Sequence, residues 1–332
     1  MSRLYNKYLQ NNKYLQKIPY LFNFFPIKNG YIHEEIKDDD YVLGASPLIK
    51  KVLREDSDWS SYLPATETQH TNNFYFDTMS CVSFSFLNCL EMIAKEKYNE
   101  DWNLSDRFLA KISGTTRNGN SMTRVADSAR KIGLITEDQY SWNRETENYE
   151  SFFETIDNTL LEIAKEFLMK YTIGYEAVLP NYNAMQEALK YSPLWVSGYA
   201  WYEKGGTYYS AGSPNHAFTI VKQDLLKKKK IAFDSYNSFV KELEWNYKFG
   251  SCKIITLEKT GNKFNIEEIN KLINKGIKFI QRPLANGEIY ELIKNELIYK
   301  TPEQARDLGI RTLSENGTLI GINEEFFNKL IL

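Results

Sequence analysis

The chain has 332 residues, of which 42% are apolar, 25% charged and 14% aromatic. Its 41 basic and 43 acidic residues nearly balance, giving a net charge of -2. A chain of this length buries a core without support from disulfides or metals. The charge balance argues against nucleic-acid and anionic-membrane partners, which usually require an excess of Lys and Arg.

The sequence also carries no obvious targeting segment. No run approaches the ~18 apolar residues of a membrane-spanning helix, and residues 1–17 lack the apolar core and cleavage site of a signal peptide. The three cysteines, Cys81, Cys89 and Cys252, are too few for a disulfide framework and leave at least one thiol unpaired within the chain. We therefore expect a cytoplasmic protein.

Three segments differ in pattern. Residues 1–60 are irregular, with the pentapeptide NKYLQ at 6–10 and again at 12–16. They are expected to form an arm that packs on the core or, alternatively, an amphipathic helix that docks on a partner. Regular helical and strand patterns fill residues 61–258, and these patterns predict the main domain there. Residues 259–332 alternate helical and turn signals and predict an appended C-terminal subdomain.

Helical periodicity dominates the first half of the main domain. Apolar spacing predicts a helix over 81–96 with Cys81 at its N-terminus, a second from Met122 to Gly133, and a third over 153–167. After Pro193 the pattern changes to runs rich in β-branched and aromatic residues, which predict strands at 194–202, 216–224, 230–237 and 252–258. Helices followed by an antiparallel sheet indicate an α+β fold. The lysines at 227–230 are expected to form a solvated hairpin tip.

Candidate reactive groups stand at the ends of these elements. Cys81 opens a helix, where the macrodipole and the first N–H groups stabilise a thiolate. His216 begins an apolar strand, and Asp234 follows it by 18 residues, in the next strand. Adjacent antiparallel strands would place the Asp234 carboxylate where it accepts an imidazole N–H. Cys89 and Cys252 are expected in the core, and without paired His or Cys spacing we expect no metal or other cofactor.

Around these residues the chain resembles the papain-like cysteine peptidases, over about residues 65–258. The segment 80–85 (SCVSFS) is similar to the family's Ser-Cys-Trp-Ala-Phe-Ser helix start, and 215–217 matches its Asn-His-Ala. Asp234-Ser235-Tyr236 stands where Asn-Ser-Trp is usual. Segments 104–109 and 133–140 are similar to the family's Leu-Ser-Glu-Gln-x-Leu and Gly-Leu-x-x-Glu-x-x-Tyr. His216 follows Cys81 by 135 positions, inside the ~130–150 spacing of papain-type enzymes.

The resemblance implies a fold and a set of site residues. The fold is a helical half, carrying the nucleophile helix, packed on an antiparallel sheet or barrel half. Cys81, His216 and Asp234 would form the catalytic triad, in which a carboxylate replaces the usual Asn and still accepts the imidazole N–H. The turn at 118–121 is similar to the family's Asn-Gly-Gly turn, so the expected substrate-binding residues are Gly119, Asn120, Ser121 and Asn215.

Several positions depart from the family pattern. The glutamine that donates to the oxyanion usually lies about six residues before the cysteine, where this chain has Tyr75. The nearest upstream glutamine, Gln69, is therefore the candidate, on a longer loop. Thr78 and Met79 replace the family's Cys-Gly pair, and Val82 replaces its Trp. No inhibitory propeptide signature is visible, although the N-terminal arm remains able to cover the cleft.

The resemblance implies acyl transfer to a thiol, with a peptide or protein as substrate. His216 takes the thiol proton, Cys81 attacks the carbonyl, and Gln69 with the Cys81 N–H holds the oxyanion until water hydrolyses the thioester. Amidase or transpeptidase action on a non-protein amide uses the same residues. The alternative is a structural or binding protein that keeps the fold without turnover. Since the Lys- and Asn-rich composition resembles phage-borne members of the family, a virion component with a protein partner fits either reading.

Overall fold

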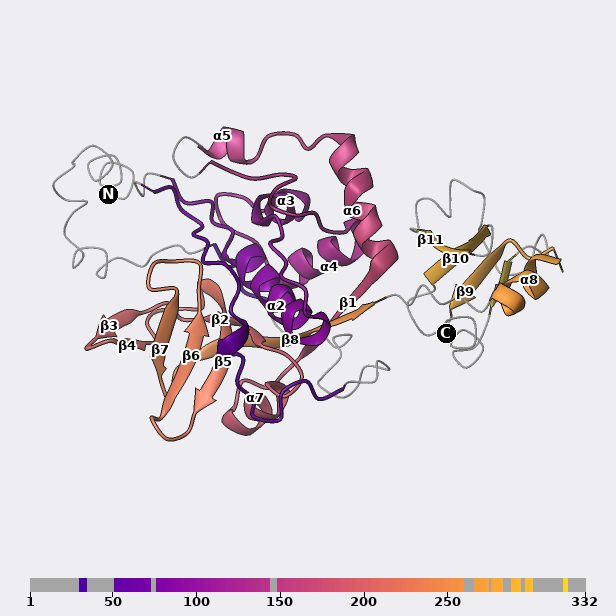
Figure 1. Ribbon diagram of the computed structural model, residues 1–332. Coiled ribbons are helices and arrows are strands. Elements are labelled where there is room, and N and C mark those ends of the chain that lie inside the picture. Colours follow the sequence, from indigo (N-terminus) through magenta and orange to yellow (C-terminus); the bar gives the residue numbers. More distant parts are fainter. Residues whose placement is uncertain are drawn as a thin grey trace. The chain divides into compact units, whose positions relative to one another are not determined.

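The computed structural model describes residues 30–34, 51–72, 76–143, 148–259, 266–274, 276–282, 288–293, 296–300 and 319–321. The chain divides into two compact units (Figure 1). The first comprises Met1–Lys165 and Ile173–Leu257, and the second Glu166–Thr172 and Glu258–Leu332. The doubled pentapeptide at 6–16 lies outside the described residues.

Helices fill the first half of the main unit, as the periodicity predicts. They are η3 (Ser60–Tyr62), α2 (Cys81–Tyr98), α3 (Asp106–Ile112), α4 (Met122–Ile132), α5 (Tyr149–Phe152), α6 (Asn158–Lys170) and α7 (Tyr182–Ala188). Cys81 is the first residue of α2, and Gly133 caps α4 with a positive φ. A Cβ at Gly133 would lie 1.8 Å from the Ala164 carbonyl oxygen, so only glycine lets the chain turn there.

The third helix begins later than the predicted residue 153. Asp157 accepts the N–H of Thr159 at 2.7 Å, the bond of a helix N-cap, and α6 starts directly after it. Phe153 ends α5 instead and packs against Phe152, with ring centroids 4.8 Å apart. Phe153 and Ile156 both pack against the core ahead of α6, so their apolar spacing extends the helical pattern past the start of the helix, which explains the error.

The second half of the main unit is an eight-stranded sheet with the order β1-β8-β2-β5-β6-β7-β4-β3. The strands are β1 (Tyr171–Ala177), β2 (Leu194–Gly198), β3 (Tyr202–Lys204), β4 (Thr207–Tyr209), β5 (His216–Asp224), β6 (Lys229–Phe233), β7 (Val240–Glu244) and β8 (Phe249–Lys259). Antiparallel pairing joins β8, β2, β5, β6 and β7, whereas β4 runs parallel to β7. The predicted α+β architecture, a helical half on a largely antiparallel sheet, is confirmed.

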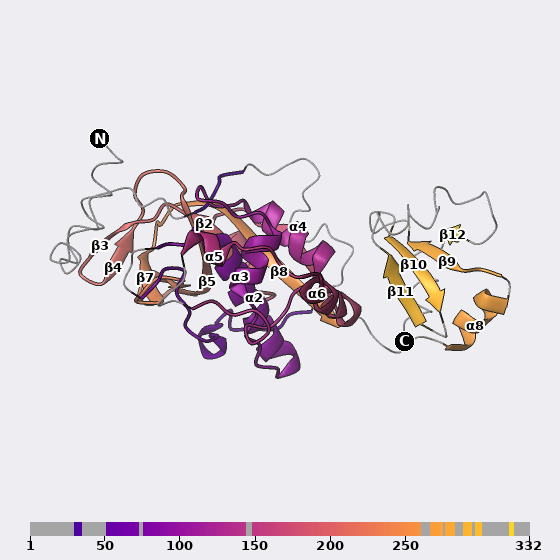
Figure 2. The same ribbon diagram turned by 90° about the horizontal axis from the view of Figure 1, so that it is seen from above.

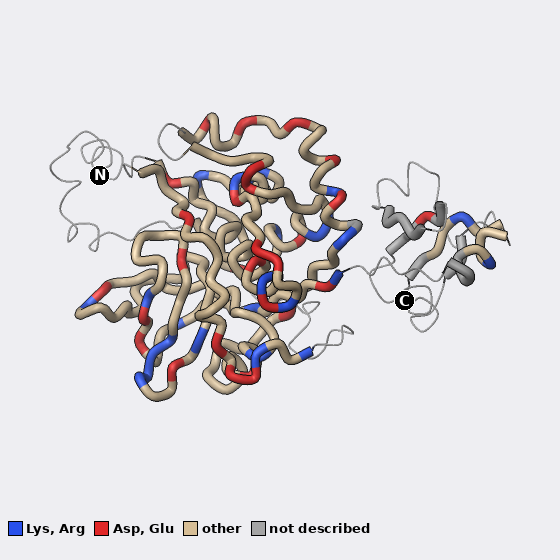
Figure 3. Tube along the Cα trace, viewed as in Figure 1, with Lys and Arg blue, Asp and Glu red and all other residues tan. Residues whose placement is uncertain are grey.

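Two predicted strands are shorter than expected. The run at 194–202 ends at Gly198, where the register with β8 shifts, and the run at 230–237 ends at Phe233, so Asp234 follows a strand instead of lying within it. The β5–β6 hairpin forms at the predicted Lys-rich segment (Figure 3). Lys230 is nevertheless buried beside the Trp245 ring, and burial lowers its pKa to about 8. The prediction of a solvated lysine is wrong at that position.

Helix α2 packs on the sheet along β5 and β2 (Figures 1 and 2). Trp195 on β2 donates its indole N–H to Ser85 Oγ at 2.9 Å, and its ring lies 5.0 Å from that of Phe86. Thr219 on β5 donates to the Ser85 carbonyl. These buried contacts fix the rotation of α2 about its axis, which places the first residue of the helix at the start of β5.

The second unit combines α8 (Ile266–Asn274) with the strands β9 (Phe279–Arg282), β10 (Glu288–Ile293), β11 (Glu296–Lys300) and β12 (Leu319–Gly321). They form a four-stranded sheet of order β11-β10-β9-β12. Of the alternating helical and turn signals expected in residues 259–332, the segment FNIEEINKLINKG (264–276) contains α8. The segment TPEQARDLG (301–309) lies outside the described residues. Within the part of the chain that the structure describes, no helix is both long and apolar enough to cross a membrane.

Candidate active site

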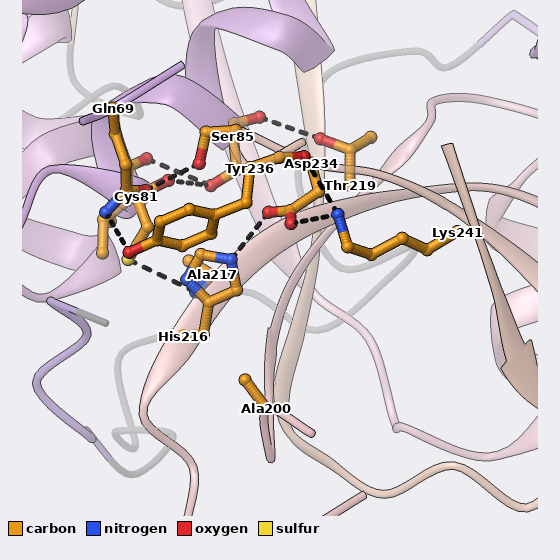
Figure 4. A network of polar contacts seen from close by, with 12 residues as sticks. Gln69, Cys81, Ser85, Ala200, His216, Ala217, Thr219, Asp234, Tyr236 and Lys241 are labelled. Atoms are coloured by element: carbon orange, nitrogen blue, oxygen red, sulfur yellow. Dashed lines mark hydrogen bonds and ion pairs between the residues drawn. The ribbon is translucent and has the colours of Figure 1, made fainter. Parts of the chain in front are cut away.

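Cys81 lies at the junction of the two halves. It is fully buried, and its Sγ accepts the backbone N–H of Ala217 at 3.4 Å (Figure 4). The N-cap residue Ser80 makes no capping side-chain bond, and the first turn of α2 contains no acidic residue. The sulfur therefore lies at the positive end of the helix dipole without a competing carboxylate on that turn.

His216 lies between Cys81 and Asp234. Its Nε2 is 2.6 Å from Asp234 Oδ1, and its buried Nδ1, which has no hydrogen-bond partner among the described residues, is the nitrogen left to exchange a proton with Cys81. Burial lowers the pKa of His216, but the negative charges of Asp234 and Cys81 outweigh it and raise that pKa to about 10. Burial raises the pKa of Asp234, whereas the positive charges of Lys241 and His216 bring it down to about 2. The pair is thus held as imidazolium and carboxylate.

An aromatic wall surrounds this ion pair. Trp201, between β2 and β3, meets the imidazole edge-on, with ring centroids 5.2 Å apart, and the Tyr236 ring lies 5.2 Å away on a different side. The predicted strand at 194–202 includes Trp201. In the structure β2 ends at Gly198, and Trp201 lies beyond it and contacts His216. By keeping water from the His216–Asp234 hydrogen bond, these rings strengthen it.

Gln69 belongs to a second polar network beside the thiol. Its amide nitrogen donates to Asp77 Oδ1 at 2.9 Å and to the Tyr236 hydroxyl at 3.0 Å, and its amide oxygen accepts from Ser235 at 2.7 Å. Tyr236 in turn donates to Asp77 Oδ2 at 2.5 Å. Both amide hydrogens of Gln69 are therefore engaged, and the network links the 69–77 loop to the loop that carries Asp234.

The turn that precedes α2 is held by the same carboxylate. Asp77 Oδ1 accepts the N–H of Met79 at 2.8 Å, and Met79 has a φ of +57°. This left-handed conformation normally favours glycine, and here a methionine adopts it. The Asp77 bond stabilises the turn without a glycine.

Residues 30–34 of the N-terminal segment run between the two halves at this point. The N–H of Asn120 donates to the Gly30 carbonyl, and the N–H of Ile32 to the Asn120 carbonyl, each at 2.8 Å. The N–H of Tyr31 donates to the carbonyl of Asn215, the residue before His216, at 3.2 Å. The segment therefore pairs with the backbone of both predicted substrate-binding turns, one of which leads into the strand that carries His216.

Close packing fixes the path of this segment. A Cβ at Gly119 would lie 1.7 Å from the Gly30 carbonyl oxygen, and a Cβ at Gly30 would lie 2.1 Å from the Met79 carbonyl oxygen. The Tyr31 side chain is buried, and its hydroxyl accepts the N–H of Glu34 at 3.3 Å. Burial raises the pKa of Tyr31, so the phenol stays neutral.

The other predicted substrate-binding side chains have local partners. Asn120 donates its side-chain amide to Ser113 and Thr115, and Asn215 Oδ1 accepts the N–H of Ala200 at 3.1 Å. Ser121 is the N-cap of α4. The backbone of these turns, not their side chains, is what faces residues 30–32.

Cys89 and Cys252 are buried and unpaired in the core, and burial raises the pKa of Cys89 to about 12. Among the described residues no group of three or more His, Cys, Asp or Glu side chains is arranged to hold a metal ion. Lys241, Asp77, Tyr236 and Trp201 were not recognised from the sequence as site residues. Only the order of the residues around Asp234 hinted at Tyr236, which stands where the family has Trp.

No protein-family model and no curated protein matches the sequence, but solved structures do. Xylellain, a cysteine protease from Xylella fastidiosa, has a TM-score of 0.53 at 12% identity, covering 68% of this chain and 95% of that one. Procathepsin L 3 of Tenebrio molitor gives 0.49 at 18% identity over 69% and 76%. Bromelain from Ananas comosus gives 0.44 at 16% identity over 60% and 98%. The α+β fold of this chain is papain-like.

Proposed function

We propose that the protein is a papain-like cysteine peptidase that cleaves peptide or amide bonds through Cys81, His216 and Asp234. The observation that carries the proposal is the position of His216, whose Nε2 lies 2.6 Å from the Asp234 carboxylate, while its buried Nδ1 has no hydrogen-bond partner among the described residues and the charge of Cys81 acts on the ring. A nucleophile, a base and an orienting acid brought together in one buried site form the arrangement that activates a thiol.

In the proposed resting state the thiol proton has already passed to His216, which leaves a Cys81 thiolate beside the imidazolium. The Cys81 thiolate attacks the carbonyl carbon, and the oxyanion is held by the Cys81 N–H and by Gln69, one of whose amide hydrogens then leaves Asp77 or Tyr236. The imidazolium protonates the leaving amine. Water attacks the thioester carbonyl, His216 takes its proton, and the free thiol returns.

Hydrolysis of a diverse peptide mixture, followed by mass spectrometry, tests the proposal. We expect cleavage products from the wild type and a loss of at least ~1000-fold in Cys81→Ala, since removing a nucleophile leaves only the residual effects of binding. Cys89→Ala is the matched control, because that thiol is buried away from His216, and it should retain cleavage. Products that persist in Cys81→Ala would contradict the proposal.

A second candidate follows from the burial of the thiol. Because Cys81 is fully buried and residues 30–32 bridge the two predicted substrate-binding turns, the chain would also suit a binding or structural protein that keeps the fold without turnover, for example a virion component. In that case neither the wild type nor a variant with the segment displaced would cleave any peptide. The proposed cytoplasmic or virion location can be examined by fractionation of the source.

A further inference from the structure

Lys241 on β7 lies directly behind the carboxylate of the proposed triad. Its Nζ is 2.8 Å from Asp234 Oδ2, and the two side chains are 2% and 0% exposed (Figure 4). The same ammonium donates at 3.0, 3.2 and 2.7 Å to the carbonyl oxygens of Tyr236, Asn237 and Ser238. A buried lysine is rare, and this one is surrounded by oxygen acceptors.

The two oxygens of Asp234 are thus divided between two cationic partners. Oδ1 faces His216 at 2.6 Å and Oδ2 faces Lys241. A carboxylate held from both sides cannot rotate without breaking a buried ion pair, so its Oδ1 stays aimed at the imidazole. The Lys241 bonds to the 236–238 carbonyls also fix the loop that follows Asp234.

We propose that Lys241 is a positioning residue of the active site, and that Asp234 and Lys241 act together as one neutral unit that orients His216. The inference rests on the proposed function. With Lys241 present, the buried set of Cys81 thiolate, His216 imidazolium, Asp234 carboxylate and Lys241 ammonium carries no net charge. Without it, one negative charge would remain uncompensated in the interior.

Three tyrosines around this pair stay neutral, because burial raises the pKa values of Tyr208, Tyr236 and Tyr247. Trp201 lies over Lys241, with Nζ 5.2 Å from the ring centroid. The charges of Asp234 and Cys81 act directly on His216. Behind the Tyr236 ring lie two further titratable groups, Asp77, which accepts from the Tyr236 hydroxyl, and His70, which stacks on the ring; every variant in the test below keeps both.

The pH profile of Cys81 alkylation by iodoacetamide, followed by intact mass, provides the test. Lys241→Met removes a cation from a buried site, so the profile midpoint should move upward by about one pH unit. Asp234→Asn removes an anion and should move the midpoint downward. The double variant restores neutrality, and its midpoint should return to within about 0.3 unit of the wild type.

Lys230→Met is the matched control. It removes another buried lysine, which lies on β6 and faces Trp245. This substitution should leave the midpoint unchanged. If Lys241→Met leaves the midpoint within about 0.2 unit of the wild type, the inference is overturned. If Lys241→Met fails to fold, Asp234→Asn is compared with the double variant, whose midpoint must be the higher of the two.

The result separates this inference from the proposed function. Alkylation that does not change in His216→Ala would overturn the thiolate–imidazolium pair itself. Alkylation that depends on His216 but not on Lys241 would leave the proposed function intact and reject Lys241 as a positioning residue. A purely structural role for Lys241 predicts a lower melting temperature with no change in the midpoint.

Discussion

Gly30→Ala is expected to increase the rate of Cys81 alkylation by at least about tenfold at neutral pH. Gly30 has a φ of +86°, and a Cβ there would lie 2.1 Å from the Met79 carbonyl oxygen. The substitution therefore destabilises the seated segment through both backbone strain and a clash. A destabilisation of about 1.4 kcal/mol raises the population of the open cleft tenfold, and labelling of a buried thiol follows that population.

Gly205→Ala is the matched control for this prediction. Gly205 also has a positive φ, +61°, but a Cβ there meets nothing within 4 Å. It carries a comparable backbone penalty without displacing residues 30–34, so its alkylation rate should equal that of the wild type. Equal rates in Gly30→Ala and the wild type would mean that the segment does not control access to Cys81. If the protein is a peptidase, peptide cleavage should rise with the alkylation rate.

Asp234→Ala is expected to reduce the free energy of unfolding by about 3 to 5 kcal/mol, because it leaves the Lys241 ammonium buried without its counter-ion. Asp234→Asn keeps one oxygen, which can still accept from His216 or Lys241, and should cost less. Denaturant unfolding at pH 6 measures both values. A loss below about 1 kcal/mol in Asp234→Ala, or equal losses in the two variants, would show that the ion pairs do not stabilise the fold.

The pH dependence of this loss follows from the two pKa shifts. The pKa of Asp234 falls from 3.8 to about 2 on folding, so its contribution is present above pH 4 and disappears as the pH falls towards 2. The pKa of His216 rises from 6.5 to about 10, so the contribution of the imidazolium is complete below pH 6.5 and is lost as the pH rises through 10. The difference between the wild type and Asp234→Ala should be greatest between pH 4 and 6.5.

The sequence located the central residues because each stands at the end of a strongly patterned element. Cys81 begins an apolar helical stripe, and His216 begins a buried strand, so local periodicity is enough to place both. Asp234 was found from its spacing, although the strand ends one residue before it. The hairpin pairing of β5 with β6 still brings its carboxylate to the imidazole.

Residues whose positions depend on tertiary packing were not predictable in this way. Lys241 lies in the polar run VKELE of β7, which shows too little apolar alternation to indicate a buried side. The pairing of Tyr31 with Asn120 joins residues far apart in the sequence, and neither has a periodic signal. Gln69 was chosen only as the nearest upstream glutamine; its position beside Tyr236 depends on the fold of the 69–77 loop.

The most direct test of the proposed active site is the pH dependence of Cys81 alkylation in the wild type and in His216→Ala. A thiolate–imidazolium pair predicts modification at Cys81 well below pH ~8.5, where a free thiol ionises, and loss of this acid-range reactivity in His216→Ala. Opening of the 30–34 segment changes the alkylation rate of Cys81 by the same factor at every pH. The pH dependence can therefore also be compared in the Gly30→Ala background. Modification that rises only at alkaline pH and does not depend on His216 would contradict the account.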